Sequence, residues 1–238
     1  MAGHSKWANI KHKKAKEDSK RGKAFTKLTK EITVCAREGG GDPAGNARLR
    51  LLMEKAREIN MPLENTMRAI KKGTGELPGA QYESHTYEGY APHGIAVMVD
   101  TLFDNKNRIA ADMRRLFSRH GGSLGESGSV NWMFEQRGVI RATGSNMTED
   151  ELLEKLLDYP IEDISKDEQL FSIQCDSKSV DKVRQAVISA GLKVEEAELE
   201  WIAKSTISLP EEQAQKVYDF LTELDDHEDV QNVYTNLE

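Results

Sequence analysis

One run of residues matches a pattern associated with nucleophilic catalysis. Gly121-Gly122-Ser123-Leu124-Gly125 fits the G-x-S-x-G pattern of hydrolases that use a serine nucleophile. In those enzymes the serine follows a strand and precedes a helix, so that its hydroxyl is exposed on a sharp turn. Here a helical pattern comes before the serine and a strand pattern after it. We therefore predict a connecting loop at Ser123. An enzyme that uses residues 121–129 is the alternative.

The other residue types that could support catalysis are not spaced for it. The six histidines have no ligand spacing, and Cys35 and Cys175 are too far apart in sequence for a CxxC zinc motif. Asp100 and Asp104 could bracket a metal ion, but such residues more often end a strand and begin a helix. Phosphate-binding loops, dinucleotide fingerprints and HExxH are absent from the sequence. These observations predict a binding protein with no catalytic residues, metal, cofactor or small-molecule substrate.

The charges are distributed unevenly along the chain. Residues 1–72 hold 18 Lys and Arg against 8 Asp and Glu, a net of +10, whereas residues 73–238 have a net of −17. A basic end on an acidic body predicts a polyanion partner, and the alternative is a lysine-rich tail that only aids solubility. Trp7, within the basic arm, could stack on a base or anchor the arm to the bundle. The predicted nucleic-acid-binding residues are Lys6, Trp7, Lys11, Lys13, Lys14, Lys16, Lys20, Arg21, Lys23, Lys27 and Lys30.

A helix that could position part of this charge is predicted over residues 20–38. Phe25, Leu28, Ile32 and Cys35 recur at helical spacing and form one apolar stripe. On a helical wheel Lys23, Lys27 and Lys30 fall on the opposite face. The wheel therefore predicts that these three lysines face solvent and can be changed without affecting the core.

Two further helices complete a small predicted bundle. Gly39-Gly40-Gly41 ends the first helix, and Asp42 followed by Pro43 predicts an N-cap and first turn for a second helix that runs to about Asn60. A third helix is predicted from Pro62 to Gly73, with Leu63, Met67 and Ile70 on its apolar face. Three short helices with short connections are typical of a helical bundle.

After the glycine-rich linker at residues 73–79, the pattern changes to short strands and helices. Strands are predicted at 85–90, 94–102, 130–134, 138–142, 171–175, 194–202, 205–209 and 230–235, and helices at 105–120, 148–157, 178–190 and 210–224. Trp132 and Trp201 fall in strand patterns and are predicted to be in the core. The last strand–helix–strand unit is too small to bury a sheet face alone. We therefore predict domains at 1–79, at 80–136 plus 204–238, and at 137–203, the last inserted into the second.

Several segments resemble one family. They are MAGHSKWANIKHKKAKEDSKRGKAFTKL, GGGDPAGNARLRL, NMPLENTMRAIKKGTGE, YEGYAPHGIAVMVDTLFDNKNR, GGSLGESGSVNWMFEQRGVI and DVQNVYTN. In this order they are similar to the YebC family, which includes the mitochondrial translational activator of cytochrome c oxidase subunit I. The resemblance implies an α+β fold, with an N-terminal three-helix bundle followed by two small α+β domains, one of them discontinuous.

The resemblance also implies a role in gene expression in the bacterial cytoplasm. That role is either a DNA-binding regulator of transcription or a translation factor that contacts ribosomal RNA and acts at proline-rich sequences. Phosphate contacts from a lysine arm suit both partners, since they carry no sequence information by themselves. The longest apolar run, Ile95–Val99, is far shorter than the roughly 20 residues of a membrane helix, so we predict no membrane partner.

Overall fold

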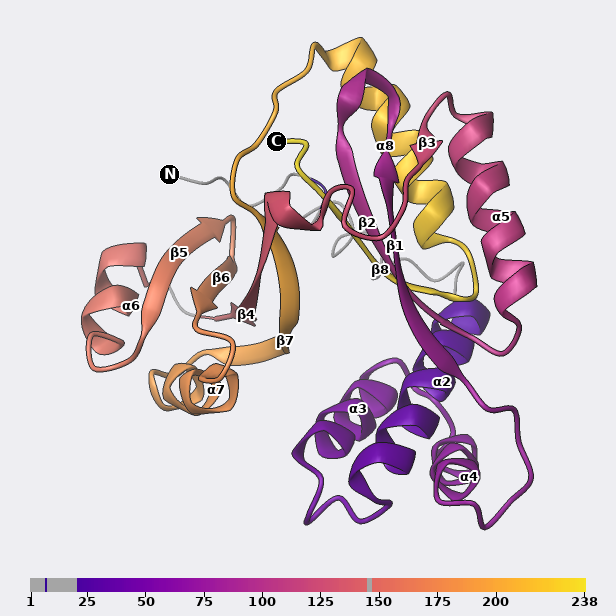
Figure 1. Ribbon diagram of the computed structural model, residues 1–238. Helices are drawn as coiled ribbons and strands as arrows, with labels where there is room; N and C mark the ends of the chain where they lie inside the picture. Colours follow the sequence, from indigo (N-terminus) through magenta and orange to yellow (C-terminus); the bar gives the residue numbers. More distant parts are fainter. Residues whose placement is uncertain (1–6, 8–20, 145–146) are drawn as a thin grey trace. The chain divides into compact units, whose positions relative to one another are not determined.

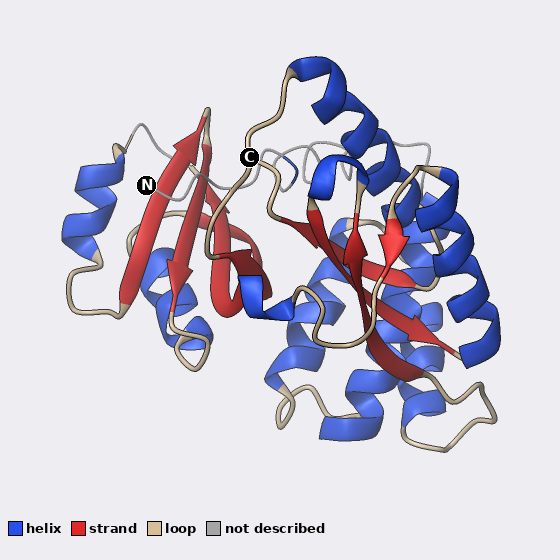
Figure 2. Ribbon diagram, turned by 45° about the horizontal axis from the view of Figure 1, so that its top comes forward, coloured by secondary structure: helices blue, strands red, loops and turns tan. Residues whose placement is uncertain are grey.

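A computed structural model describes Trp7, residues 21–144 and residues 147–238, with only the backbone for Arg21. This part of the chain divides into two compact units. The first contains Trp7, Asn131–Ser208 and Tyr234–Glu238, and the second contains residues 21–130 and Leu209–Val233. The predicted α+β fold is confirmed by two four-stranded sheets and the helices that accompany them (Figures 1 and 2).

The N-terminal helical bundle consists of α2 (Arg21–Gly39), α3 (Ala47–Glu58) and α4 (Leu63–Gly73). Its core includes Leu28 and Ile32 of α2, Leu49 of α3 and Ile70 of α4, all at most 4% exposed. The apolar stripe predicted for the first helix is therefore the face that packs against α3 and α4.

The start of α3 differs from the prediction. Asn46, not Asp42, is the N-cap, and its Oδ1 accepts from the Leu49 amide at 3.0 Å. Its Nδ2 donates to the carbonyls of Cys35 at 3.1 Å and Gly40 at 2.9 Å, which ties the end of α2 to the start of α3. Asp42 instead begins a turn, where its carboxylate accepts from the Ala44 amide. The backbone needs this extra turn before α3 can pack back on α2.

The buried face of α4 is also rotated relative to the prediction. Thr66, Ala69 and Ile70 are buried, whereas Leu63 is 62% exposed and Met67 is 41% exposed. A Cβ atom at Gly73 would lie 2.3 Å from the Thr33 carbonyl oxygen of α2. The close approach of α4 to α2 therefore requires glycine there and determines which side of α4 is buried.

The first sheet has the strand order β3-β1-β2-β8. Its strands are β1 (Glu83–Tyr90), β2 (Ala96–Phe103), β3 (Ser123–Leu124) and β8 (Val230–Thr235), and a short 3-10 turn, η2 (Pro92–Gly94), joins β1 to β2. The helices α5 (Lys106–Arg119) and α8 (Glu211–Asp225) lie side by side, with the rings of Phe117 and Phe220 4.9 Å apart in an edge contact (Figure 1). Asn105 caps α5 as predicted.

The second sheet has the strand order β5-β6-β4-β7, with every neighbouring pair antiparallel. Its strands are β4 (Phe134–Thr143), β5 (Ile161–Asp167), β6 (Leu170–Cys175) and β7 (Lys193–Ala203). The helices α6 (Glu149–Lys155) and α7 (Val180–Ser189) contribute Leu152 and Val187 to a core that also contains Ile140 and Phe171. The predicted cap at Thr148 is confirmed as a reciprocal capping box with Glu151.

Two predicted strands are wrong. Residues 131–133 form a 3-10 turn, η3 (Asn131–Met133), and Trp132 is 62% exposed rather than in the core. In a strand Trp132 would share a face with Val130 and Phe134, but these two are buried while Trp132 is exposed, as the 3-10 turn allows. Residues 205–209 form only an isolated bridge between Ile207 and Leu237. Trp201 is half-buried in β7.

The three-domain division stays a prediction. β8 joins the sheet that contains β1 and β2, which is the arrangement expected of a discontinuous domain. However, β4 begins at Phe134, so the predicted boundary between residues 136 and 137 falls inside a continuous strand. The bundle and the first sheet also belong to the same compact unit.

Candidate nucleic-acid interface

The three lysines predicted on the outer face of α2 have different surroundings. Lys23 is exposed, Lys27 is half-buried and Lys30 is only 6% exposed. The prediction that all three face solvent is therefore wrong for Lys30 and only partly right for Lys27. The helical wheel is correct about α2 itself, but residues from the far end of the chain pack against this face.

Asp229 is the centre of these contacts. Its side chain is fully buried, and its two carboxylate oxygens accept hydrogen bonds from Lys30 Nζ and, at 2.9 Å, from Arg108 Nη2. Burial alone would raise the pKa of the Asp229 carboxyl, but the hydrogen bonds and charges of Lys30 and Arg108 hold that pKa below its usual value. One carboxylate thus joins α2 to the start of α5.

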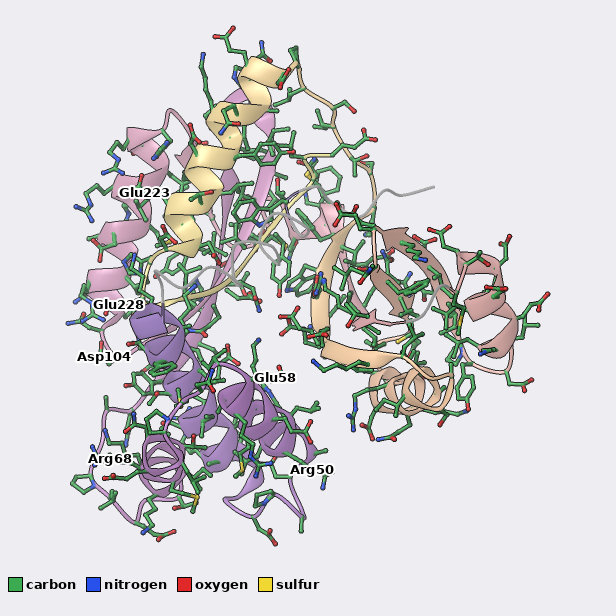
Figure 3. All side chains as sticks on the ribbon, turned by 180° about the vertical axis from the view of Figure 1, so that it is seen from behind. Arg50, Glu58, Arg68, Asp104, Glu223 and Glu228 are labelled. Atoms are coloured by element: carbon green, nitrogen blue, oxygen red, sulfur yellow. The ribbon has the colours of Figure 1, made fainter. Side chains whose placement is uncertain are left out.

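The segment between α8 and β8 supplies the other partners of α2. We call residues 225–229 the acidic turn, because it contains Asp225, Asp226, Glu228 and Asp229. Lys30 Nζ donates to the Glu228 carbonyl at 3.0 Å, and Lys27 Nζ donates to the Asp225 carbonyl at 2.5 Å. Figure 3 shows Glu228 and Asp104 beside α2. The two lysines are therefore engaged by this turn.

Lys27 is held more loosely than Lys30. Its Nζ lies 3.6 Å from Asp225 Oδ1, and the two side chains keep 18% and 15% of their surface exposed. Lys23, one turn earlier, forms no ion pair with a carboxylate in the described part of the chain. Along the basic face of α2, Lys23 is therefore exposed, Lys27 is in a partly exposed contact with Asp225, and Lys30 is in a buried ion pair.

The remaining predicted binding residues precede α2. Lys6, Lys11, Lys13, Lys14, Lys16 and Lys20 lie outside the described residues, as does the side chain of Arg21. Trp7 is 2% exposed and belongs to the unit that contains the second sheet. Both roles considered for Trp7, stacking on a base and anchoring the arm to the bundle, stay predictions.

Other cations on the bundle were not predicted as binding residues, because they lie outside both the arm and the first helix. The exposed ones are Arg48, Arg50 and Arg57 of α3, and Arg68, Lys71 and Lys72 of α4. Arg50 and Arg57 are two turns apart on the same side of α3, a spacing that the sequence shows. Glu54 and Glu58 are also exposed on this helix, so its outer surface is of mixed charge. Figure 3 shows Arg50, Glu58 and Arg68 on the bundle.

The serine of the G-x-S-x-G pattern does not lie on a nucleophile elbow. The helix α5 precedes Ser123 as predicted, but Ser123 lies in the short strand β3, paired with Tyr90 of β1, and not in the predicted loop. The loop that follows is held by Glu88 of β1, whose carboxylate accepts from the amides of Gly128 at 2.7 Å and Val130 at 2.9 Å. In the described part of the chain, no histidine bonds to the Ser123 hydroxyl.

The two aspartates considered as metal ligands have protein partners. Asp100 Oδ1 accepts from the Thr86 hydroxyl at 2.6 Å, and Asp104 Oδ1 accepts from Arg108 at 2.9 Å. Among the described residues, no group of three His, Cys, Asp or Glu side chains is placed to hold a metal ion. Within the same part of the chain, no helix combines the length and apolarity needed to cross a bilayer.

The architecture defines a class of mixed α+β proteins with a basic helical bundle at the N-terminal end and two four-stranded sheets. The chain belongs to the TACO1/YebC family. Residues 5–76 match the sequence model of the N-terminal domain of that family, and residues 82–237 match the model of its second and third domains.

Several relatives and one solved structure resemble the chain over nearly its whole length. A probable transcriptional regulatory protein of Chlorobaculum tepidum is 52% identical, covering 100% of this chain and 95% of the relative. One of Caldanaerobacter subterraneus subsp. tengcongensis is 50% identical, covering 100% and 98%. The crystal structure of a conserved hypothetical protein from Aquifex aeolicus has a TM-score of 0.87 at 44% identity, covering 94% of this chain and 93% of that one.

Proposed function

We propose that this protein is a non-enzymatic regulator of gene expression that binds nucleic acid through its basic N-terminal end. The observation that carries the proposal is the net charge of +10 on residues 1–72, against −17 on the rest of the chain. A polyphosphate attracts the first region and repels the second, so binding is oriented. The names of the relatives, probable transcriptional regulatory proteins, support the same general role.

The cations that we propose to contact phosphate are the lysines of the arm, Lys23 and Lys27. By sequence the arm contributes Lys6, Lys11, Lys13, Lys14, Lys16 and Lys20. Lys30 is instead paired with Asp229. Arg50, Arg57, Arg68, Lys71 and Lys72 add exposed positive charge on the bundle. Contacts of this kind track the phosphate backbone and do not read bases.

The salt dependence of binding tests the proposal. The dissociation constants of the full-length protein for a mixed-sequence DNA duplex and for a single-stranded RNA are measured over a range of salt concentrations. If about five to seven phosphates are contacted, the logarithm of the affinity for the duplex falls with the logarithm of salt at a slope of about −4 to −6. Affinity that does not depend on salt, or no binding at all, overturns the proposal.

A translation factor that contacts ribosomal RNA and relieves stalling at proline-rich sequences is the second candidate. It is favoured by the surface of α3, where the exposed Glu54 and Glu58 would face the phosphates of a duplex that received this helix in its major groove. A flexible set of phosphate contacts suits irregular RNA at least as well as a duplex. Sedimentation of a cell lysate on a sucrose gradient, with and without ribonuclease, distinguishes the two. Nuclease-sensitive co-sedimentation with ribosomes supports the second candidate, and a pool only at the top of the gradient supports the first.

A further inference from the structure

The three lysines on one face of α2 differ in what their ammonium groups contact. Lys30 Nζ is buried against Asp229 and the Glu228 carbonyl, while Lys23 has no carboxylate partner among the described residues. Lys27 is intermediate, because its Nζ bonds to the backbone carbonyl of Asp225 and only approaches the carboxylate, at 3.6 Å. Lys27 is thus at the boundary between a buried ion-pair network and an exposed basic surface.

We propose that Asp225 is an internal competitor for phosphate at Lys27. In the free protein the Asp225 carboxylate partly neutralises this lysine, and in the complex a phosphate of the nucleic acid replaces it. This inference rests on the proposed function, because it concerns the regulation of the same basic face. It assigns to the acidic turn a role in tuning affinity as well as in packing.

The position of Asp225 supports this role. Asp225 is the last residue of α8, and Asp226 is the C-cap. The C-terminal end of a helix carries partial negative charge, so a carboxylate there is locally unfavourable. The α8 helix therefore gains nothing from a charge at Asp225. Lys27 is the cation that the structure places beside it.

The geometry also permits the exchange without opening the protein. Lys27 and Asp225 keep 18% and 15% of their side-chain surface exposed. Asp225 Oδ1, the oxygen 3.6 Å from Lys27 Nζ, is buried without a hydrogen-bond partner among the described residues, so no hydrogen bond of this oxygen is lost when a phosphate takes over Lys27. The deeper pair of Lys30 and Asp229 stays in place, because Asp229 is fully buried and holds Arg108 as well. Lys23, one turn away on the same face, can contact the neighbouring phosphate. The contact that has to be exchanged is the one between Lys27 and the Asp225 carboxylate.

Neutralising Asp225 tests the proposal. The Asp225→Asn variant of the full-length protein is compared with wild type for binding to a mixed-sequence single-stranded RNA and to a DNA duplex of the same sequence. We expect several-fold tighter binding at moderate salt, because Lys27 no longer has to exchange a carboxylate for a phosphate. The salt slope should change little, since Lys27 contacts a phosphate in both complexes. Adding Lys27→Gln to Asp225→Asn should abolish the gain in affinity.

The matched control is Asp219→Asn on the same helix. Asp219 is exposed and accepts from Gln215 at 2.8 Å, so this substitution removes the same charge without affecting Lys27. If Asp225→Asn and Asp219→Asn change affinity equally, the effect is one of net charge only and the proposal is wrong. The proposal is also wrong if the wild type binds with the expected salt slope but Asp225→Asn binds no more tightly than the wild type. A wild type that binds neither probe overturns the proposed function itself.

Discussion

Two buried ion-pair networks, one in each compact unit, differ in what they connect. In the second sheet, Arg141 of β4 makes a bidentate contact with Glu200 and a longer one, 3.3 Å, with Glu196, both on the neighbouring strand β7. Beside the bundle, Asp229 connects Lys30 and Arg108, which are 199 and 121 positions away in sequence. The first network strengthens a strand pair that backbone hydrogen bonds already hold. The second joins elements that no sheet ladder connects.

This difference shows that buried charge can serve two purposes in one chain. A pair within a sheet could be replaced by well-packed apolar residues with little loss, because the strands stay paired. The junction at Asp229 depends on one carboxylate with two cationic partners, so its loss leaves both cations without their shared partner.

The largest effect is expected at the junction. Asp229→Ala leaves Lys30 buried without a counter-charge and removes one partner of Arg108, so we expect a loss of about 3–5 kcal/mol in the free energy of unfolding of this unit. Native-state hydrogen exchange on the full-length protein, read at the amides of α2 and β2, measures it. Unchanged protection of these amides would contradict the role given to Asp229.

The network of the second sheet should tolerate replacement of both partners. Arg141→Met alone leaves Glu200 buried and should cost about 3 kcal/mol in the unit that contains the sheet. Combining it with Glu200→Leu should recover most of that loss, since β4 and β7 remain paired by their backbones. Urea denaturation of the single and double variants gives the two free energies. A double variant as unstable as the single one would place this network in the same class as the junction.

A smaller effect concerns acid. The folded pKa of Asp229 is depressed, so its contribution to stability is present above the unfolded pKa of about 3.9 and is lost as the pH falls through that value toward the folded pKa. The unit with the bundle should therefore lose stability below about pH 4. Thermal unfolding followed between neutral pH and pH 3 should show a shallower acid dependence in Asp229→Asn. Parallel curves for the two proteins would contradict the assignment.

The smallest effect on stability is expected at Lys23. Because its side chain is exposed and forms no ion pair with a described carboxylate, Lys23→Gln should change the free energy of unfolding by less than about 0.5 kcal/mol. The same variant should make the salt slope of nucleic-acid binding shallower by about 0.7 to 0.9. Lys30→Gln should instead cause a large loss of stability and leave the salt slope almost unchanged. Thermal unfolding and binding titrations on both variants test the contrast between exposed and buried lysines.

The sequence was sufficient where local rules determine the structure. The caps at Asn105 and Thr148, the glycine end of α2 and the final strand at residues 230–235 are as predicted, because each depends on a few neighbouring residues. β5 was not predicted because Ile161–Asp167 is mostly polar and half-buried, without clear alternation.

The error on the candidate site has a different origin. A helical wheel for α2 shows which side faces its own bundle, but the partner of Lys30 is at the opposite end of the chain. A carboxylate at Asp229, between Glu228 and the mixed polar and apolar strand β8, has no local feature that indicates full burial. Contacts of this sequence separation depend on the tertiary fold, and the sequence alone did not indicate them.

The place of β8 in the first sheet also sets an order of events during synthesis. All four strands of the second sheet lie between Phe134 and Ala203, so each of them is translated before β8. The strand β2 is almost entirely apolar, and one of its edges stays unpaired until β8 (Val230–Thr235) joins the sheet. A nascent or prematurely released chain therefore displays an open apolar edge, the kind of surface that promotes aggregation. The edge of β2 is therefore covered only when residues 230–235 are available to pair with it.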